Sequence, residues 1–320
     1  MNDQILQIVL ASDESYVMQT SILITSLFSN NSYSFDHINI HLLSNNISEN
    51  SIEIIKTHIP KSKGSLKIYN ISDIHSKLGV KVPNTISISS YSRLFISSFL
   101  NNSIEKVIYF DVDAIVNGSL LQLWRTNIDQ YYVAGVLDDI SEYTKKKIGL
   151  NKGDNYINAG MLLINLKLWR ADNLEQRMLK FLKLNNGNVY HHDQGIINAI
   201  SQNKIKILPP QYNIVTNYFV LPYNHFKRLS PFYDQEEFEL AKKAPIFIHF
   251  TAGVAGRPWH RNCRHPLKNL YIKYKNETYY KDVDYLTDLT PYKIKFLSAL
   301  FYNAPILYKF TLKLRSIIKE

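Results

Sequence analysis

Two carboxylates separated by one residue, Asp111 and Asp113, are the most chemically distinctive feature of this 320-residue sequence. They directly follow an apolar run, 107–110, that is typical of a buried strand. Two unpaired charges are too costly to bury, so both side chains are expected beyond the strand's end. Mg²⁺ and Mn²⁺ prefer such oxygen ligands beside substrate phosphates. The pattern predicts a divalent-metal site, with solvated turn carboxylates as the alternative.

A second candidate group follows the apolar run 246–248, which places His249 at a strand end. Gly253, Gly256 and Arg257 come shortly after it. A neutral imidazole could complete a metal's ligands, glycines let backbone N–H groups approach a phosphate, and Arg257 adds positive charge. A histidine with a purely structural role is the alternative here.

The first half of the chain alternates apolar runs with helical patterns. Strands are predicted at 5–11, 37–43, 66–71 and 107–110, and helices at 16–28, 49–58 and 91–100. This alternation predicts an α/β fold with a mainly parallel sheet and helices on both faces. In such sheets ligands bind beyond the carboxyl ends of the strands. Because the first strand ends at Ala11-Ser12-Asp13, we expect this segment at the same edge as Asp111.

The second half of the chain is less regular. Strands are predicted at 157–166 and 246–250, and helices at 172–184 and 193–200. The region that follows these elements is basic and rich in tyrosine. We therefore predict a main domain, 1–262, and a helical C-terminal appendage, 263–320.

The net charge of +10 is compatible with an anionic partner. The sequence contains no nucleic-acid-binding motif, so no nucleic-acid partner is expected. Residues 291–320 carry six Lys/Arg against one acid, mixed with apolar side chains. This mixture is typical of a helix lying on an anionic membrane surface, and a helix packed on the domain with a solvated basic face fits it equally.

The expected compartment is the cytoplasm. Peripheral attachment to the inner face of the cytoplasmic membrane is a further expectation, which depends on residues 291–320. The first residues lack the pattern of a signal peptide, and no apolar run is long enough to span a membrane. The single cysteine, Cys263, excludes an intramolecular disulfide. His260, Cys263 and His265 lack a fourth ligand, so we do not predict a zinc site.

Several motifs in order between residues 5 and 259 resemble the retaining glycosyltransferases of family 8, and most closely the bacterial lipopolysaccharide α-galactosyl- and glucosyltransferases. The segments that carry the resemblance are Ala11-Ser12-Asp13-Glu14-Ser15-Tyr16, Ser89-Ser90-Tyr91-Ser92-Arg93-Leu94, Asp111-Val112-Asp113, Asn158-Ala159-Gly160, His192-Asp193-Gln194 and His249. The resemblance implies a Rossmann-like nucleotide-sugar-binding fold of the GT-A type.

The resemblance also implies roles for these residues. Tyr16 would stack on uracil and Asp13 would hydrogen-bond it, within a donor-binding segment that includes Ala11 and Ser15. The other implied donor contacts are Arg93, Asp111, Val112, Asp113, Asn158, Ala159, Gly160, His249, Gly253 and Arg257. Asp111, Asp113 and His249 would hold Mn²⁺ or Mg²⁺. On the catalytic face, Asp193 would bind the donor sugar, Gln194 would lie beneath the reacting carbon, and Asp138 would lie near the donor sugar.

The sequence departs from the family pattern in its last motif. The spacing from His249 to Arg257-Pro258-Trp259 is two residues longer than usual, and an arginine replaces the usual lysine. Arginine keeps the charge, but its planar guanidinium requires a different approach to the diphosphate. Ser15 and Gly195 also stand where other members often have longer polar side chains.

The expected activity is transfer of galactose or glucose from a UDP-sugar to a glycan or lipid-linked glycan acceptor, in the synthesis of lipopolysaccharide or another cell-surface polysaccharide. Gln194 would act either as a weak nucleophile or as a stabiliser of an oxocarbenium-like state. Two alternatives come from other classes. One is a phosphatase of the haloacid dehalogenase type, disfavoured because three strands precede Asp111. The other is a catalytically silent sugar-nucleotide-binding protein.

Overall fold

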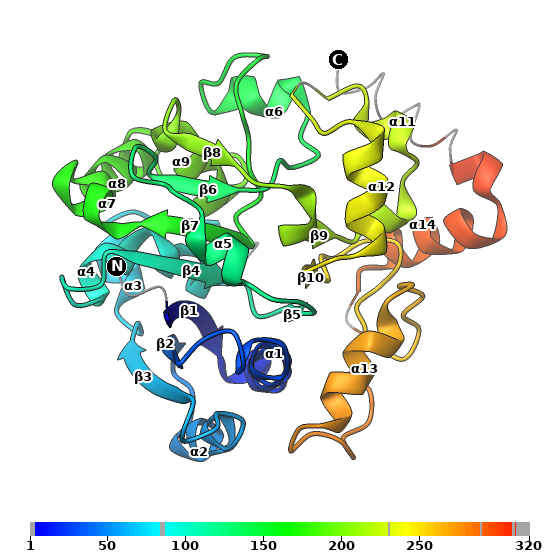
Figure 1. Cartoon of the computed structure of the whole chain (residues 1–320). Helices are drawn as coiled ribbons and strands as arrows, with labels where there is room; N and C mark the ends of the chain where they lie inside the picture. Colours follow the sequence, from blue (N-terminus) through cyan, green and yellow to red (C-terminus); the bar gives the residue numbers. More distant parts are fainter. Residues whose placement is uncertain (1–3, 84–86, 230, 289, 309–310, 312–320) are drawn as a thin grey trace.

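A seven-stranded sheet forms the centre of the molecule in the computed structural model, which describes residues 4–83, 87–229, 231–288, 290–308 and 311 (Figure 1). The strands lie in the order β3 (Gly64–Asn70), β2 (His37–Asn45), β1 (Ile5–Asp13), β4 (Lys106–Phe110), β7 (Met161–Asn165), β6 (Val133–Gly135) and β8 (Ile205–Ile207). β7 runs antiparallel to its neighbours β4 and β6, and the other paired strands are parallel. The predicted α/β fold with a mostly parallel sheet is confirmed.

Helices cover both faces of this sheet because its central strands are apolar on both sides. Alternate residues of β1 enter different cores: Leu6, Ile8 and Leu10 pack with α1 (Val17–Asn31), whereas Val9 packs on the opposite face. The first face also contacts α2 (Glu49–Thr57) and α5 (Leu121–Arg125). The helices on the second face are α3 (Ile74–Leu78), α4 (Ile96–Phe99), α7 (Leu166–Ala171), α8 (Leu174–Leu184) and α9 (His192–Ser201).

A small second sheet of three strands lies beside the main one. It consists of β5 (Ala114–Val116), β10 (Phe247–His249) and β9 (Ile214–Val215). β10 pairs antiparallel with β5, so that His249 lies opposite Ala114. The remaining described α-helices are α6 (Glu142–Lys147), α10 (Asn217–Val220), α11 (Tyr223–Phe226), α12 (Gln235–Lys243), α13 (Lys268–Asn276) and α14 (Tyr292–Asn303).

The helix predicted at 91–100 is wrong in type and in its start. The segment is a 3₁₀ helix, η2 (Ile88–Phe95), followed by the short α4. Serine side chains explain the difference, since the Ser90 and Ser92 hydroxyls donate to the carbonyl oxygens three residues earlier, and the Ser87 hydroxyl accepts from the Ser89 N–H. Such local bonds offer the backbone an alternative to the α-helical ladder.

The C-terminal helices pack on the rest of the chain through few residues. Tyr271 of α13 is fully buried beside Phe250 and Trp259, and Asn30 of α1 donates to the Tyr274 hydroxyl at 2.8 Å. In α14 only Leu297 is buried, against a cluster that includes Val254 and Ala255. The second part of the predicted basic region, 309–310 and 312–320, lies outside the described residues. The domain division at residue 262 stays a prediction.

Candidate active site

The carboxyl ends of β1 and β4 meet at one edge of the sheet, as predicted. The two strands are parallel neighbours, with Leu10 opposite Phe110, so Asp13 and Asp111 leave the sheet on the same side. A cleft of about 500 Å³ lies at this edge. The predicted residues that line it are Ala11, Asp13, Tyr16, Arg93, Asp111, Val112, Asp113, Ala159, Asp193, Gln194 and Arg257.

Asp111, Asp113 and His249 form a candidate metal site in the cleft wall. Their ligand atoms all lie within 4.8 Å of one another, and His249 Nε2 is 3.0 Å from Asp113 Oδ1 and 3.9 Å from Asp111 Oδ2. The small sheet delivers His249 to this place, and the Phe250 N–H donates to the Asp113 carbonyl oxygen at 2.9 Å. Two carboxylates and one imidazole suit Mn²⁺ or Mg²⁺, so these three residues fit the ion that was expected.

Gly160 holds the His249 ring in position by leaving room for it. A side chain of even one carbon at Gly160 would overlap the imidazole at Cε1 and Nδ1. His249 Nδ1 is buried without a hydrogen-bond partner. The ring is therefore held by packing on one side and by the carboxylates on the other. Gly160 itself does not line the cleft, and acts on the site through the histidine.

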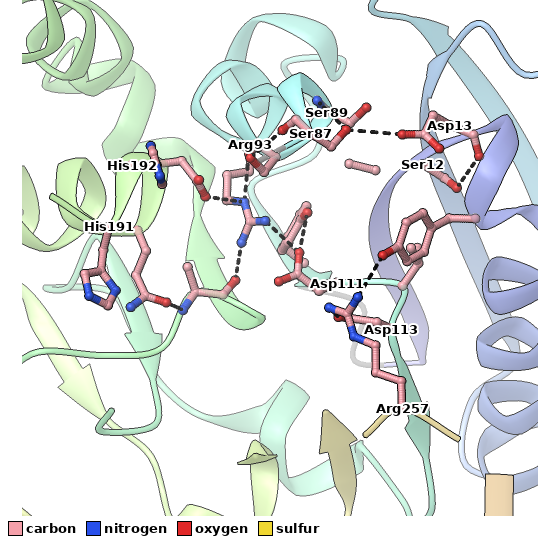
Figure 2. Close-up of a pocket in the computed structure, with 18 residues that line it drawn as sticks. Ser12, Asp13, Ser87, Ser89, Arg93, Asp111, Asp113, His191, His192 and Arg257 are labelled. Atoms are coloured by element: carbon pink, nitrogen blue, oxygen red, sulfur yellow. Dashed lines mark hydrogen bonds and ion pairs between the residues drawn. The ribbon is translucent and has the colours of Figure 1, made fainter. Parts of the chain in front are cut away.

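Asp113 is also paired with Arg257, at the side of the cleft nearest β1. Arg257 Nη2 lies 3.0 Å from Asp113 Oδ2, and Nη1 donates to the Tyr16 hydroxyl at 3.1 Å (Figure 2). Burial would raise the pKa of Asp113, but His249 and Arg257 outweigh it and lower that pKa to about 2. Burial also lowers the pKa of His249, and Asp113 reverses that effect, so the net pKa is raised. Asp113 is thus a carboxylate at any neutral pH.

Arg93 is buried at the centre of the site, where it joins three parts of the chain (Figure 2). Its guanidinium lies 2.6 Å from Asp111 Oδ1 and 2.9 Å from Asp193 Oδ2, and it donates to the Ala159 carbonyl oxygen at 2.6 Å. The guanidinium also stacks 4.4 Å from the centre of the Tyr109 ring. These contacts orient both carboxylates, which is a role that the sequence alone did not indicate.

The amide of Gln194 has a defined orientation. Its Oε1 accepts from the Ala159 N–H at 3.0 Å, and its Nε2 donates to Asp138 Oδ2 at 2.8 Å and to the Tyr156 hydroxyl at 3.1 Å. Because the Ala159 N–H can only donate, the carbonyl end of the amide must face it. Asp138 lies behind Gln194 and does not line the cleft. Burial and the adjacent Asp138 raise the pKa of Asp139 to about 8, so Asp139 is largely protonated at neutral pH.

The other predicted site residues lie at the margin of the cleft or outside it. The Ser15 hydroxyl donates to Asp13, which also accepts from the Ser87 hydroxyl at 3.2 Å. Asn158 is buried, and its side-chain oxygen accepts from the Gly160 N–H at 2.9 Å. Gly253 lines a separate cavity of about 220 Å³ beside α14. Among the described residues, the one metal-like cluster is that of Asp111, Asp113 and His249, and it does not include His260, Cys263 or His265.

Sequence reasoning missed three residues that line the cleft: Ser87, Tyr109 and His191. It gave no individual role to four others that lie within the motif segments: Ser12, Ser89, Ser90 and His192. The run of serines at 87–92 was a usable signal, because a cluster of hydroxyls in a polar segment can bind a ligand. His191 and His192 have positive φ angles of 59° and 54°, which no pattern in the sequence indicated.

The fold and the site match a known class of proteins. The model of glycosyl transferase family 8 matches residues 7–263, so this chain belongs to glycosyltransferase family 8. A putative glycosyltransferase of Haemophilus influenzae is 31% identical over 280 residues, covering 84% of this chain and 78% of that protein. An Escherichia coli lipopolysaccharide 1,2-glucosyltransferase is 25% identical, covering 78% of this chain and 71% of that protein.

Solved structures agree on the fold. The galactosyltransferase LgtC, in complex with donor and acceptor sugar analogs, superposes with a TM-score of 0.71 at 23% identity, covering 86% of this chain and 96% of that chain. This similarity confirms the GT-A type of fold. Family membership also argues against the phosphatase alternative. Within the part of the chain that the structure describes, no helix has the length and apolar character needed to cross a membrane.

Proposed function

We propose that this chain is a retaining hexosyltransferase that uses UDP-galactose or UDP-glucose, with Mn²⁺ or Mg²⁺ held by Asp111, Asp113 and His249. The acceptor is a glycan or a lipid-linked glycan in the synthesis of lipopolysaccharide or another cell-surface polysaccharide. Relatives named as lipopolysaccharide glucosyl- and galactosyltransferases support this pathway. The protein would act in the cytoplasm.

The observation that carries the proposal is the metal-like cluster in the cleft of a family 8 fold. A divalent ion bound there would act as a Lewis acid on the diphosphate as negative charge develops on it. Arg257 lies next to the cluster and adds a fixed positive charge for the same oxygens. Gly253 lies outside the cleft, so its contact with a diphosphate requires the loop before Arg257 to move.

The donor would lie along the cleft with its base near β1. Asp13 and Tyr16 stand at that end, where Figure 2 shows Asp13 and Arg257 on the side of the cleft away from His191 and His192. Ala11, Ser15 and Val112 complete that end. The hexose would lie toward Asp193 and Gln194, against the segment formed by Asn158, Ala159 and Gly160, with Asp138 supporting Gln194 from behind.

Replacing Gln194 with alanine is expected to lower turnover by about 100-fold while changing donor binding little. The amide is fixed by its bonds to Ala159 and Asp138, so its orientation would be set before the reacting carbon, proposed to lie next to it, acquires charge. Steady-state kinetics of transfer and calorimetric titration with the UDP-sugar measure the two quantities. Gln122, which is exposed on α5, gives the matched control Gln122→Ala. Unchanged turnover in Gln194→Ala would remove this residue from the mechanism.

The test of the proposed function is a titration of the protein with a panel of nucleotide sugars, by calorimetry, with Mn²⁺ and with EDTA. Metal-dependent binding of one UDP-hexose, together with its hydrolysis in the absence of acceptor, is the expected result. Binding without any turnover would favour the catalytically silent alternative. Binding that is independent of metal, or no binding of any UDP-sugar, would contradict the proposal.

We also propose that 291–320 attaches the protein to an anionic membrane surface. In α14, Tyr292 and Phe296 are exposed, and Lys293 is exposed beside them. Apolar and basic side chains together on one short segment suit an anionic interface. Only the part of this region up to Tyr308, and Thr311, is described by the structure.

Deletion of 291–320 is expected to abolish binding to vesicles containing anionic lipid, and to leave UDP-sugar binding intact. Because the deletion also removes the buried Leu297, the variant Tyr292→Ser/Phe296→Ser is a second test that keeps this contact. It should weaken vesicle binding about tenfold or more, since two apolar side chains no longer enter the interface. Flotation with neutral and anionic vesicles measures the effect. Equal binding by all forms would refute the membrane proposal.

A further inference from the structure

A row of aromatic side chains leads from Gln194 to the protein surface. The Tyr156 hydroxyl lies 3.1 Å from Gln194 Nε2, and the Tyr156 ring meets that of His191 edge-on at 6.3 Å. The His191 ring lies 5.5 Å from Tyr190 at an angle of 31°. Tyr190 in turn meets Tyr143 edge-on at 6.2 Å. The rings therefore form a continuous path, in which His191 lines the cleft.

The outer part of this row is exposed. Tyr190 retains 41% and Tyr143 retains 46% of their surface, whereas Tyr156 is buried. Single exposed aromatic residues are ordinary. Two that contact each other, and that a ring contact links to His191 in the cleft, are typical of a binding surface. Tyr143 comes from α6 and Tyr190 from the turn before α9, so two separate elements bring these side chains together.

The turn that carries Tyr190 depends on a glycine. A side-chain carbon at Gly195 would overlap the Tyr190 carbonyl oxygen, so only glycine allows this close approach. His191 and His192 hold positive φ angles of 59° and 54°, a left-handed conformation that is unfavourable for residues other than glycine. Such conformations persist where the surrounding structure fixes the backbone, and they concentrate at ligand sites. The position of Tyr190 is therefore set by the fold.

We propose that His191, Tyr190 and Tyr143, which we call the aromatic track, bind the sugar rings of the acceptor glycan next to the transferred hexose. This inference rests on the proposed function. Sugar rings present C–H faces that pack on aromatic rings, and the tyrosine hydroxyls can bond to sugar hydroxyls. Because the two tyrosines follow one another outward from the cleft, the acceptor contacts them with successive sugars. The track thus selects an oligosaccharide over a single sugar.

The direction of the track agrees with the placement proposed for the donor. His191 and His192 lie on the opposite side of Asp111 from Asp13 and Arg257 (Figure 2). The nucleotide end of the donor would lie on the side of Asp13 and Arg257. An acceptor that enters past His191 would therefore not overlap the nucleotide. Lys147 lies 5.1 Å from the Tyr143 ring, so the outer end of the track is also cationic.

The test uses the full-length protein with UDP-hexose and Mn²⁺, and the variants Tyr190→Ala and Tyr143→Ala. Tyr33, which is fully exposed, gives the matched control Tyr33→Ala. Acceptors are core oligosaccharides released from Gram-negative lipopolysaccharides and, as single sugars, methyl galactosides and methyl glucosides. Each track variant is expected to raise the KM for the oligosaccharide about tenfold. The rate of UDP-hexose hydrolysis without acceptor should stay within about twofold of wild type.

A set of outcomes separates failure of the track from failure of the proposed function. Oligosaccharide KM values equal to those of Tyr33→Ala would overturn the track, as would wild-type protein that hydrolyses UDP-hexose but uses none of the oligosaccharides. Equal losses with single-sugar acceptors would also overturn it. A wild type that neither binds nor hydrolyses a UDP-sugar would overturn the proposed function and the track with it. Tyr190→Phe, which keeps the ring, is expected to restore most of the affinity.

Discussion

Changing both Asp111 and Asp113 to asparagine is expected to abolish Mn²⁺-dependent binding of a UDP-hexose and to lower turnover by about 1000-fold or more. Asparagine keeps the size and one oxygen of each side chain but removes both negative charges, which attract the cation. Without the ion, the diphosphate loses its Lewis acid and would be held only by neighbouring groups such as Arg257. Calorimetry with and without EDTA, together with transfer kinetics, measures both losses.

The double variant needs a control for folding, because Asp113 pairs with both His249 and Arg257. Asp129, which is exposed beyond α5, gives the matched control Asp129→Asn. Thermal unfolding of the double variant shows whether the fold survives. A folded double variant that still binds the UDP-hexose in a Mn²⁺-dependent manner would contradict the assignment of these carboxylates as metal ligands.

The parts of the fold that the sequence predicted well are those with local patterns. β1 and β4 are apolar on both faces, and their parallel pairing follows from the alternation of strands and helices. Because the carboxyl ends of both strands lie at the same edge of the sheet, the sequence alone predicted that Asp13 and Asp111 would lie close together. The strand predicted at 157–166 was too long at both ends, because β7 begins at Met161 and α7 begins at Leu166. Boundaries depend on caps and tertiary contacts, which periodicity does not encode.

Long-range contacts account for what the sequence could not indicate. His249 reaches the carboxylates because β10 pairs with β5, which is more than 100 residues away in the sequence. The need for glycine at position 160 arises only from the imidazole that packs against it. In the same way, Gly195 was visible as a departure from the family pattern, but its contact with the Tyr190 carbonyl follows from a turn with two positive φ angles. In each case the sequence indicated the chemistry of the residue, but it did not indicate which residues would surround it in the fold.

The role of Arg93 is the clearest case of this kind. In the sequence analysis, the family resemblance implied that Arg93 contacts the donor. In the structure the Arg93 side chain is only 4% exposed, and its guanidinium joins Asp111 to Asp193. The same residue therefore supports the metal site on one side and the sugar side of the cleft on the other. The contribution of Arg93 can therefore be measured in the free energy of unfolding as well as in the activity.

Replacing Arg93 with methionine is expected to lower the free energy of unfolding by about 3–5 kcal/mol, because it leaves the buried Asp193 without its partner. Methionine fills similar space, so the loss reflects charge more than packing. Urea unfolding measures it. The control Arg261→Met removes an ion pair with Asp284 whose side chains are 69% and 73% exposed, and should cost less than about 1 kcal/mol.

A second variant separates the charge effect from other damage. Arg93→Met/Asp193→Asn removes the stranded carboxylate as well, and should recover part of the lost stability, since a neutral amide is less costly to bury than an unpaired charge. Asp111, which is more exposed than Asp193, keeps water as a partner and so adds less to the loss. An Arg93→Met variant as stable as Arg261→Met would mean that the two aspartates do not depend on this guanidinium. The site would then be organised by its metal and donor alone.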